Sequence, residues 1–104
     1  MKKYTVNMDI NDVKDRIQRL LIAIYGRAKN KKDNKDIIFY PAYKFMDIDA
    51  YYLDVTIVIR KVTNTKTIII ADYNVQTSKD NWRHEILQRV YDKIIEYIPK
   101  AIDI

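Results

Sequence analysis

Few side chains in this chain could do chemistry, because it has a single histidine and no cysteine. His84 stands one helical turn after Asp80 and one before Gln88, so on a helix the three side chains would share a face. Such a group could form an acid–base pair or hold a metal through two ligands. A lone histidine without a second histidine or a cysteine is more typical of a solvated helix residue. We therefore expect no metal and no cofactor.

Two aspartates are candidates for a Mg²⁺-dependent hydrolytic centre. PD-(D/E)xK nucleases, which the chain resembles in its predicted order of elements, carry an acid on one strand and an acid-x-Lys triplet on the next; the resemblance would imply that the carboxylates hold the metal and that the lysine orients the water. Asp54 could supply the first acid, but Asp72 is followed two residues later by Asn74 instead of a lysine. The chain also lacks a glycine-rich phosphate loop and a G-x-S-x-G turn. We therefore predict that the protein is not an enzyme.

The net charge of +5 is concentrated in one stretch of the sequence. Residues 27–35 contain five basic residues and one acid, a local charge of +4, which leaves +1 for the rest of the chain. We interpret this stretch as a basic loop, 27–36, that either is simply solvated or contacts the phosphates of a nucleic acid. The candidate anion contacts are Arg27, Lys29, Lys31, Lys32 and Lys35.

Two amphipathic helices are predicted, one on each side of a β-rich segment. The first spans about 9–26, because Asp9 can cap it, apolar residues then recur every three or four positions, and Gly26 can end it in the left-handed conformation. The second spans about 78–98 and ends before Pro99, whose ring cannot continue a helix. Each helix has an apolar stripe that needs cover.

Three segments rich in β-branched and aromatic residues are predicted strands, at about 37–46, 51–60 and 66–74. Their connections are too short for parallel crossovers and require antiparallel hairpins. Pro41 cannot donate to a ladder, which predicts that the first strand is an edge strand or is bulged there. We expect one domain, 1–104, of the α+β class: a two-layer αβββα arrangement, helix–three-stranded antiparallel sheet–helix, with both helices on one sheet face.

The sheet face that the helices leave uncovered is predicted to be unusually apolar. With Leu53, Val55, Ile57, Ile68 and Ile70 directed inward, alternation turns tyrosines, aliphatic residues and bases outward. Apolar patches edged by charge are typical of contact surfaces, although tyrosines beside bases could also stack single-stranded nucleic acid, and Ile102 and Ile104 could fold over the face. We favour a protein interface, formed by Tyr40, Lys44, Tyr52, Val58, Arg60, Ile69 and Tyr73.

The predicted element order resembles that of three groups of proteins. PD-(D/E)xK nucleases share the order, but their lysine is replaced by Asn74, and double-stranded-RNA-binding domains share it, but Asp80 interrupts the basic opening of the second helix. The outline with a tyrosine- and proline-containing first strand is similar to that of small phage neck and tail-completion proteins. This resemblance implies a non-enzymatic assembly protein of a phage or mobile element that contacts other protein subunits, with a homo-oligomeric ring as one arrangement. A nucleic-acid-binding module and a small inhibitor of a host enzyme are the alternatives.

The N-terminus is basic but reaches Asp9 before an apolar stretch accumulates, so no signal peptide is predicted. No apolar run approaches the ~20 residues that cross a bilayer, and the absence of cysteine excludes a disulfide scaffold. The abundant Lys, Asn, Ile and Tyr are encoded by AT-rich codons, which suggests an AT-rich bacterium or its phage. We expect the protein in the host cytoplasm or in a virion, away from membranes.

Overall fold

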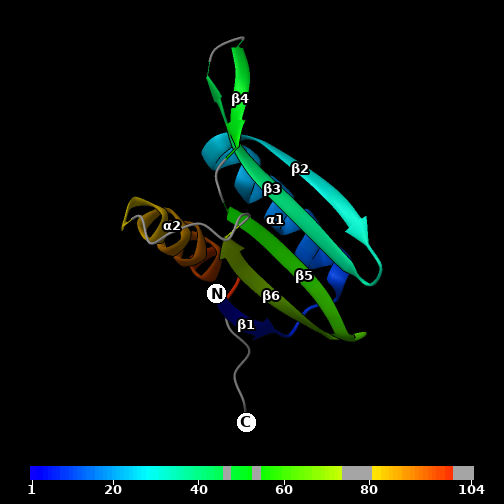
Figure 1. Cartoon of the computed structure of the whole chain (residues 1–104). Coiled ribbons are helices and arrows are strands. Elements are labelled where there is room, and N and C mark those ends of the chain that lie inside the picture. The colour runs from blue at the N-terminus through cyan, green and yellow to red at the C-terminus, as the bar shows by residue number, and fades with distance from the viewer. Residues whose placement is uncertain (46–47, 53–54, 74–80, 100–104) are drawn as a thin grey trace.

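The computed structural model describes residues 1–45, 48–52, 55–73 and 81–99, with only the backbone described at 27, 42–45, 48–52, 73 and 81–84. It belongs to the α+β class, as expected, but it has more strands than the three that were predicted. In chain order the elements are β1 (Lys2–Val6), α1 (Ile10–Tyr25), β2 (Gly26–Asp33), β3 (Asp36–Phe45), β4 (Ile48–Tyr52), β5 (Val55–Thr63), β6 (Lys66–Tyr73) and α2 (Asn81–Tyr97) (Figure 1).

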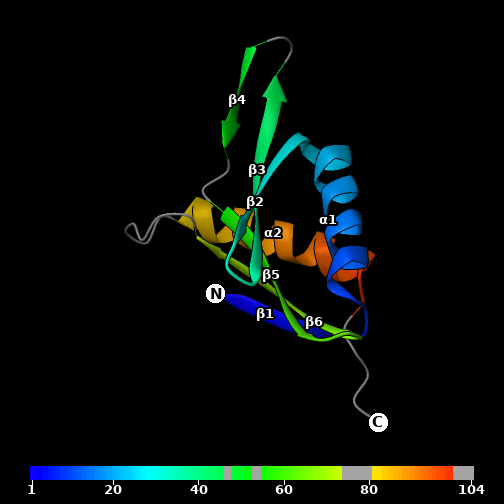
Figure 2. The same ribbon diagram turned by 90° about the vertical axis from the view of Figure 1, so that its right-hand side faces the viewer.

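The strands form one antiparallel sheet in the order β1-β6-β5-β3-β2, and β4 pairs with β3 outside this path. Both helices lie on the same side of the sheet (Figure 2), as predicted. The expected strand 51–60 is divided between β4 and β5, and β1 was not expected at all. A strand of five residues that begins with two lysines gives too short an alternation to be recognised.

Helix α1 begins and ends where its capping residues predict. The side chain of Asp9 accepts hydrogen bonds from the backbone N–H groups of Asn11 and Asp12, at 2.6 and 3.2 Å. Gly26 has a φ of 88°, in the left-handed region, and its N–H donates to the carbonyl of Ile22. The helix then buries the stripe Val13, Ile17, Leu21 and Tyr25.

The predicted basic loop is wrong, because residues 26–33 form strand β2 and pair with β3 along the whole length of β2. A two-residue turn at Asn34 and Lys35 joins the two strands, and Asn34 has a φ of 54°. Lysine is depleted in strands, so its abundance here predicted a loop, and pairing with the apolar β3 overrides that preference. Lysines on an edge strand also oppose the addition of a further strand.

Pro41 does not mark an edge strand, as had been expected, because β3 lies between β2 and β5. Strand β3 pairs with β5 over Asp36–Phe39 and with β4 beyond Pro41, so the proline falls between these two ladders. Its missing N–H therefore interrupts neither of them. The register shift of β3 lies further along, between Tyr43 and Phe45.

The core lies between the sheet and the two helices, and β1 is tied directly to the end of α2. The hydroxyl of Tyr4 donates to the carbonyl of Ile98 at 3.0 Å, and its ring meets Tyr91 edge-on at 5.7 Å. Burial, with a smaller contribution from Tyr91, raises the pKa of Tyr4 well above its usual range. The buried apolar side chains are Tyr4, Val6, Val13, Ile17, Leu21, Tyr25, Phe39, Val55, Ile57, Ile59, Ile69, Ala71, Leu87, Val90, Ile94 and Ile98.

The turn between β2 and β3 gives the first prediction. Because Asn34 is in the left-handed region, Asn34→Gly should leave the free energy of unfolding nearly unchanged. Asn34→Val should lower it by about 1–2 kcal/mol, because a β-branched side chain is strained in the left-handed region that asparagine and glycine tolerate. Urea unfolding of the three proteins measures this difference. Equal stability of the two variants would contradict the hairpin.

The second prediction concerns Tyr4, whose raised pKa favours the neutral phenol in the folded state. Stabilisation by this group is present below the unfolded pKa of about 10 and is lost as the pH rises above it towards the folded value. Tyr4→Phe should lower the free energy of unfolding by about 1–3 kcal/mol at neutral pH, because the carbonyl of Ile98 loses its donor.

Above pH ~10 the stability of the wild type should therefore fall more steeply than that of Tyr4→Phe. Urea unfolding over a series of alkaline pH values measures the two curves. Curves that stay parallel would show that Tyr4 is not buried as described.

Candidate functional site

The register between β5 and β6 decides which side chains face away from the helices. Lys61 stands opposite Thr67 and Thr63 opposite Lys66, so that Val62 between them is an extra residue on β5. This is a β-bulge, and Val62 remains 51% exposed. The bulge shifts the pairing of all residues of β5 that precede it by one position.

Because of the bulge, the predicted orientation of β6 is wrong. Ile69 was expected on the uncovered face, but it is 1% exposed and lies opposite Ile59 in the core. The prediction corresponds to a register without the bulge, in which Arg60 would stand opposite Ile69. A slip of one residue moves every side chain to the other face, so Ile68 and Ile70 face outward and not inward.

We call the helix-free side of the sheet, seen edge-on in Figure 2, the outer face. Tyr40, Val58 and Arg60 lie on it as predicted, by alternation with the buried residues of β3 and β5. The side chains of Lys44, Tyr52 and Tyr73, and the whole of Asp54, lie outside the described residues. Registers and alternation place on the outer face Lys3 and Thr5 of β1, Ile68, Ile70 and Asp72 of β6, Val58 and Arg60 of β5, Asp36, Ile38 and Tyr40 of β3, and Lys29, Lys31 and Asp33 of β2.

Three aliphatic residues form a row across the central strands of the outer face. Val58 on β5 stands opposite Ile38 on one side and Ile70 on the other, and all three are partly exposed. Lys31 continues the row beyond Ile38, and Lys3 continues it beyond Ile70. We call Ile38, Val58 and Ile70 the apolar row. It is an apolar strip with a lysine at each end.

An ion pair lies next to the apolar row on the same face. The guanidinium of Arg60 donates two hydrogen bonds to the carboxylate of Asp36, each of 2.8 Å. These hydrogen bonds from Arg60 lower the pKa of Asp36 below its usual value. Asp33 stands directly opposite Asp36, so the arginine also offsets the repulsion between the two acids. Arg60 was predicted as an interface residue, and in the structure its guanidinium is bound to Asp36.

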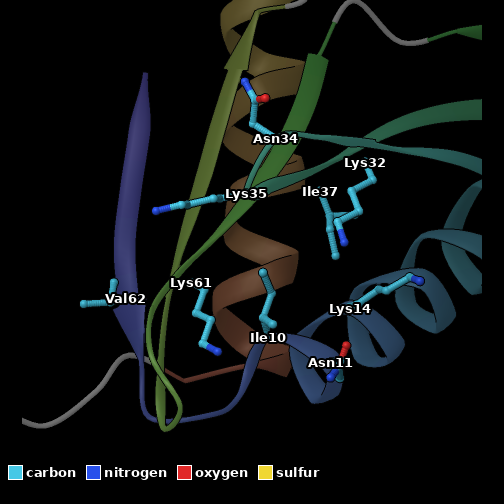
Figure 3. Close-up of a pocket in the computed structure, with 9 residues that line it drawn as sticks. All are labelled: Ile10, Asn11, Lys14, Lys32, Asn34, Lys35, Ile37, Lys61 and Val62. Atoms are coloured by element: carbon cyan, nitrogen blue, oxygen red, sulfur yellow. The ribbon is translucent and has the colours of Figure 1, made fainter.

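A second candidate site lies on the helix side of the sheet, at the end where the β2–β3 and β5–β6 hairpins approach the start of α1. It is a hollow of about 620 Å³, which we call the basic hollow. Figure 3 shows its lining side chains on α1, on the β2–β3 hairpin and on the end of β5. They are Ile10, Asn11, Lys14, Lys32, Asn34, Lys35, Ile37, Lys61 and Val62.

Hydrogen bonds between α1 and β2 hold one side of the basic hollow in place. The side-chain amide of Gln18 donates to the carbonyl of Ala28 at 3.1 Å. The side-chain amide of Asn30 donates to the oxygen of Gln18 at 3.0 Å. Strand β2 is therefore fixed over α1 by polar contacts, and its lysine-rich end is held near the start of the helix.

The predicted basic residues are divided between the two sides of the sheet. Lys32 and Lys35 line the basic hollow, whereas alternation turns Lys29 and Lys31 to the outer face, and the side chain of Arg27 is not described. The sequence did not indicate Lys14 and Lys61 as part of the same site. No local spacing could reveal them, because the site joins a helix to the ends of two separate hairpins.

The lysine side chains that line the basic hollow can bind an anion. Among the described residues there is no cluster of three or more acidic, histidine or cysteine side chains that could hold a metal. Asp80 lies outside the described residues, as does the side chain of His84, so their predicted pairing is not tested. Within the same described part of the chain, no helix is long and apolar enough to span a membrane.

Two comparisons with known proteins give no relative. No protein-family model matches the chain, and no curated protein is similar to it at the significance required.

Proposed function

We propose that this chain is a non-enzymatic assembly protein that packs the outer face of its sheet against a second copy of itself. The observation that carries the proposal is the apolar row, Ile38–Val58–Ile70, in register on the face that neither helix covers. The setting we propose is a phage or mobile-element assembly, which the residue usage and the resemblance of outline suggest.

The central strands are apolar on both faces. Two of them contain uninterrupted aliphatic runs, Ile57–Ile59 in β5 and Ile68–Ile70 in β6. An antiparallel sheet that meets water on one side normally alternates apolar and polar residues, and a continuous run is typical of a strand covered on both faces. The helices cover one face of the sheet, so the aliphatic runs favour a protein surface packed against the other face.

The pattern of the outer face is self-complementary. Val58 is at the centre of the apolar row, with an isoleucine on each side, Ile38 and Ile70. A two-fold axis through Val58 and along the strands would place Ile38 of one copy on Ile70 of the other. Isologous dimers need this property, because the same patch serves both partners.

The face supports a weak association. At a strand spacing of about 4.8 Å, Lys3 and Lys31 are roughly 19 Å apart, and about six residues per strand give an area on the order of 400 Å². This is below the ~800 Å² per partner of a standard interface. The lysines at the ends of the row would repel those of a second copy, and salt would screen that repulsion.

Edge-to-edge assembly through β1 or β2, the two ends of the strand order, is disfavoured by the composition of these strands. Strand β1 carries Lys2 and Lys3, and β2 carries Lys29, Lys31 and Lys32. Charged edges oppose pairing with a further strand. The face is therefore a better assembly surface than the edges formed by β1 and β2.

The test is Val58→Lys, which places a charge at the centre of the apolar row. The wild type should show a weight-average mass that rises with concentration, and more strongly at high salt, in sedimentation velocity. Val58→Lys should stay at the monomer mass, which requires a loss in affinity of at least ~10-fold, or about 1.4 kcal/mol. Val58→Thr, a milder change, should reduce association partly.

The matched control is Val62→Lys, the same substitution at the exposed bulge, which should associate as the wild type does. Circular dichroism of each variant shows that the fold is kept. A wild type that stays monomeric at every concentration and salt, or a Val58→Lys variant that associates normally, would contradict the proposal.

A further inference from the structure

We propose that the basic hollow binds the sugar–phosphate backbone of a nucleic acid. This function is separate from self-association, because the hollow lies on the helix side of the sheet and the apolar row on the outer face. The inference rests on the lysines that the fold brings together there, on the absence of acids among the described residues that line it, and on the continuation of positive charge beyond it.

Four lysines from distant parts of the sequence line the basic hollow. Lys14 comes from α1, Lys32 from the end of β2, Lys35 from the turn and Lys61 from the end of β5 (Figure 3). Among the described residues, none of the ion pairs involves any of these four side chains. None of the acids in the described part of the chain therefore occupies these amines, which could bind an anion from outside.

Three of the acids that adjoin the lining residues in sequence are on the other face or already engaged, and Asp12 and Asp15 are exposed on α1 and are not part of the lining. Asp33 and Asp36 adjoin Lys32 and Lys35 in sequence, but the alternation of the strands turns them to the outer face, where Arg60 binds Asp36. Asp9 accepts two backbone hydrogen bonds as the cap of α1. None of the nine described lining residues is acidic. The period-two alternation thus separates positive from negative charge at this end of the sheet.

The shape and chemistry of the hollow fit a phosphodiester segment. Its volume of about 620 Å³ is large enough for a nucleotide-sized group. Lysine binds phosphate as a flexible point charge and needs no fixed geometry. Ile10 and Ile37, both packed against the core, are the apolar part of the lining and could contact a sugar. Asn11 and Asn34 add side-chain amides that could donate to phosphate oxygens.

Charge beyond the hollow favours a polymer over a small anion. The same hairpin carries Lys29 and Lys31 on its outer face, so positive charge continues around strand β2 from the hollow. A free phosphate would use the hollow alone, whereas a nucleic-acid strand could follow the hairpin and also contact Lys29, which lies outside the apolar row. The net charge of +5 would also steer a polyanion towards the chain.

The experiment measures fluorescence anisotropy of labelled single- and double-stranded oligonucleotides at about 50 and about 200 mM salt. The wild type should bind at the lower salt. With four phosphate contacts in the hollow the slope of log K against log salt should be about −3 for a single strand and about −3.6 for a duplex, and each further contact along the hairpin would make it steeper. The two oligonucleotides show which form is preferred.

The test variant is Lys32→Gln with Lys61→Gln, which should weaken binding at low salt at least ~10-fold and reduce the slope by about 2. The control is Arg89→Gln with Lys93→Gln, which removes the same charge from exposed positions on α2 and should bind nearly as the wild type does. Sedimentation velocity should show that both double variants still self-associate through the apolar row.

Three results would overturn the proposal. The first is no anisotropy change with either oligonucleotide at low salt. The second is an equal loss in the α2 control, which would mean that overall charge and not the hollow is responsible. The third is that inorganic tripolyphosphate binds, as measured by calorimetry, whereas neither oligonucleotide does. This result would make the hollow a small-anion site.

Discussion

The β-bulge at Val62 sets the register on which the apolar row and the core depend. It places Val58 opposite Ile70 and Ile59 opposite Ile69, and therefore decides which isoleucine of β6 is buried. Without it, every side chain of β5 that precedes it would face a different partner on β6. The apolar row exists because the bulge brings Ile70 into line with Val58, and the core is closed because Ile69 joins Ile59 on the helix side.

Strand alternation then gives the two sides of the sheet different chemistry. The outer face has an aliphatic centre, lysines at its ends and the Asp36–Arg60 ion pair. The helix side has the core and, at one end, the basic hollow with Lys32 and Lys61. These surfaces should respond to salt in opposite ways, because screening weakens phosphate binding and relieves repulsion between like lysines. Salt dependence therefore separates assembly from nucleic-acid binding in a single preparation.

The sequence predicted what depends on local signals and failed where tertiary contacts decide. Asp9 and Gly26 predicted the ends of α1 correctly, because capping is local, and Pro99 correctly limited α2. Strand β2 was missed because its lysines oppose strand formation until β3 pairs with it. The outward orientation of Ile69 was wrong because a uniform run of isoleucines carries no period and the bulge leaves no composition signal. Of the basic hollow, only Lys32 and Lys35 were predicted, since Lys14 and Lys61 join them only through the fold.

The most direct test of this account is a cross-strand disulfide, which is unambiguous because the chain has no native cysteine. Val58→Cys combined with Ile70→Cys should form a disulfide under mild oxidation, since directly opposite residues have Cα atoms about 5 Å apart. Val58→Cys combined with Ala71→Cys should remain reduced, because the two side chains would point to opposite faces. Mass spectrometry of the monomer distinguishes the two outcomes. A disulfide in the second pair and none in the first would place Ile69 on the outer face and contradict the register.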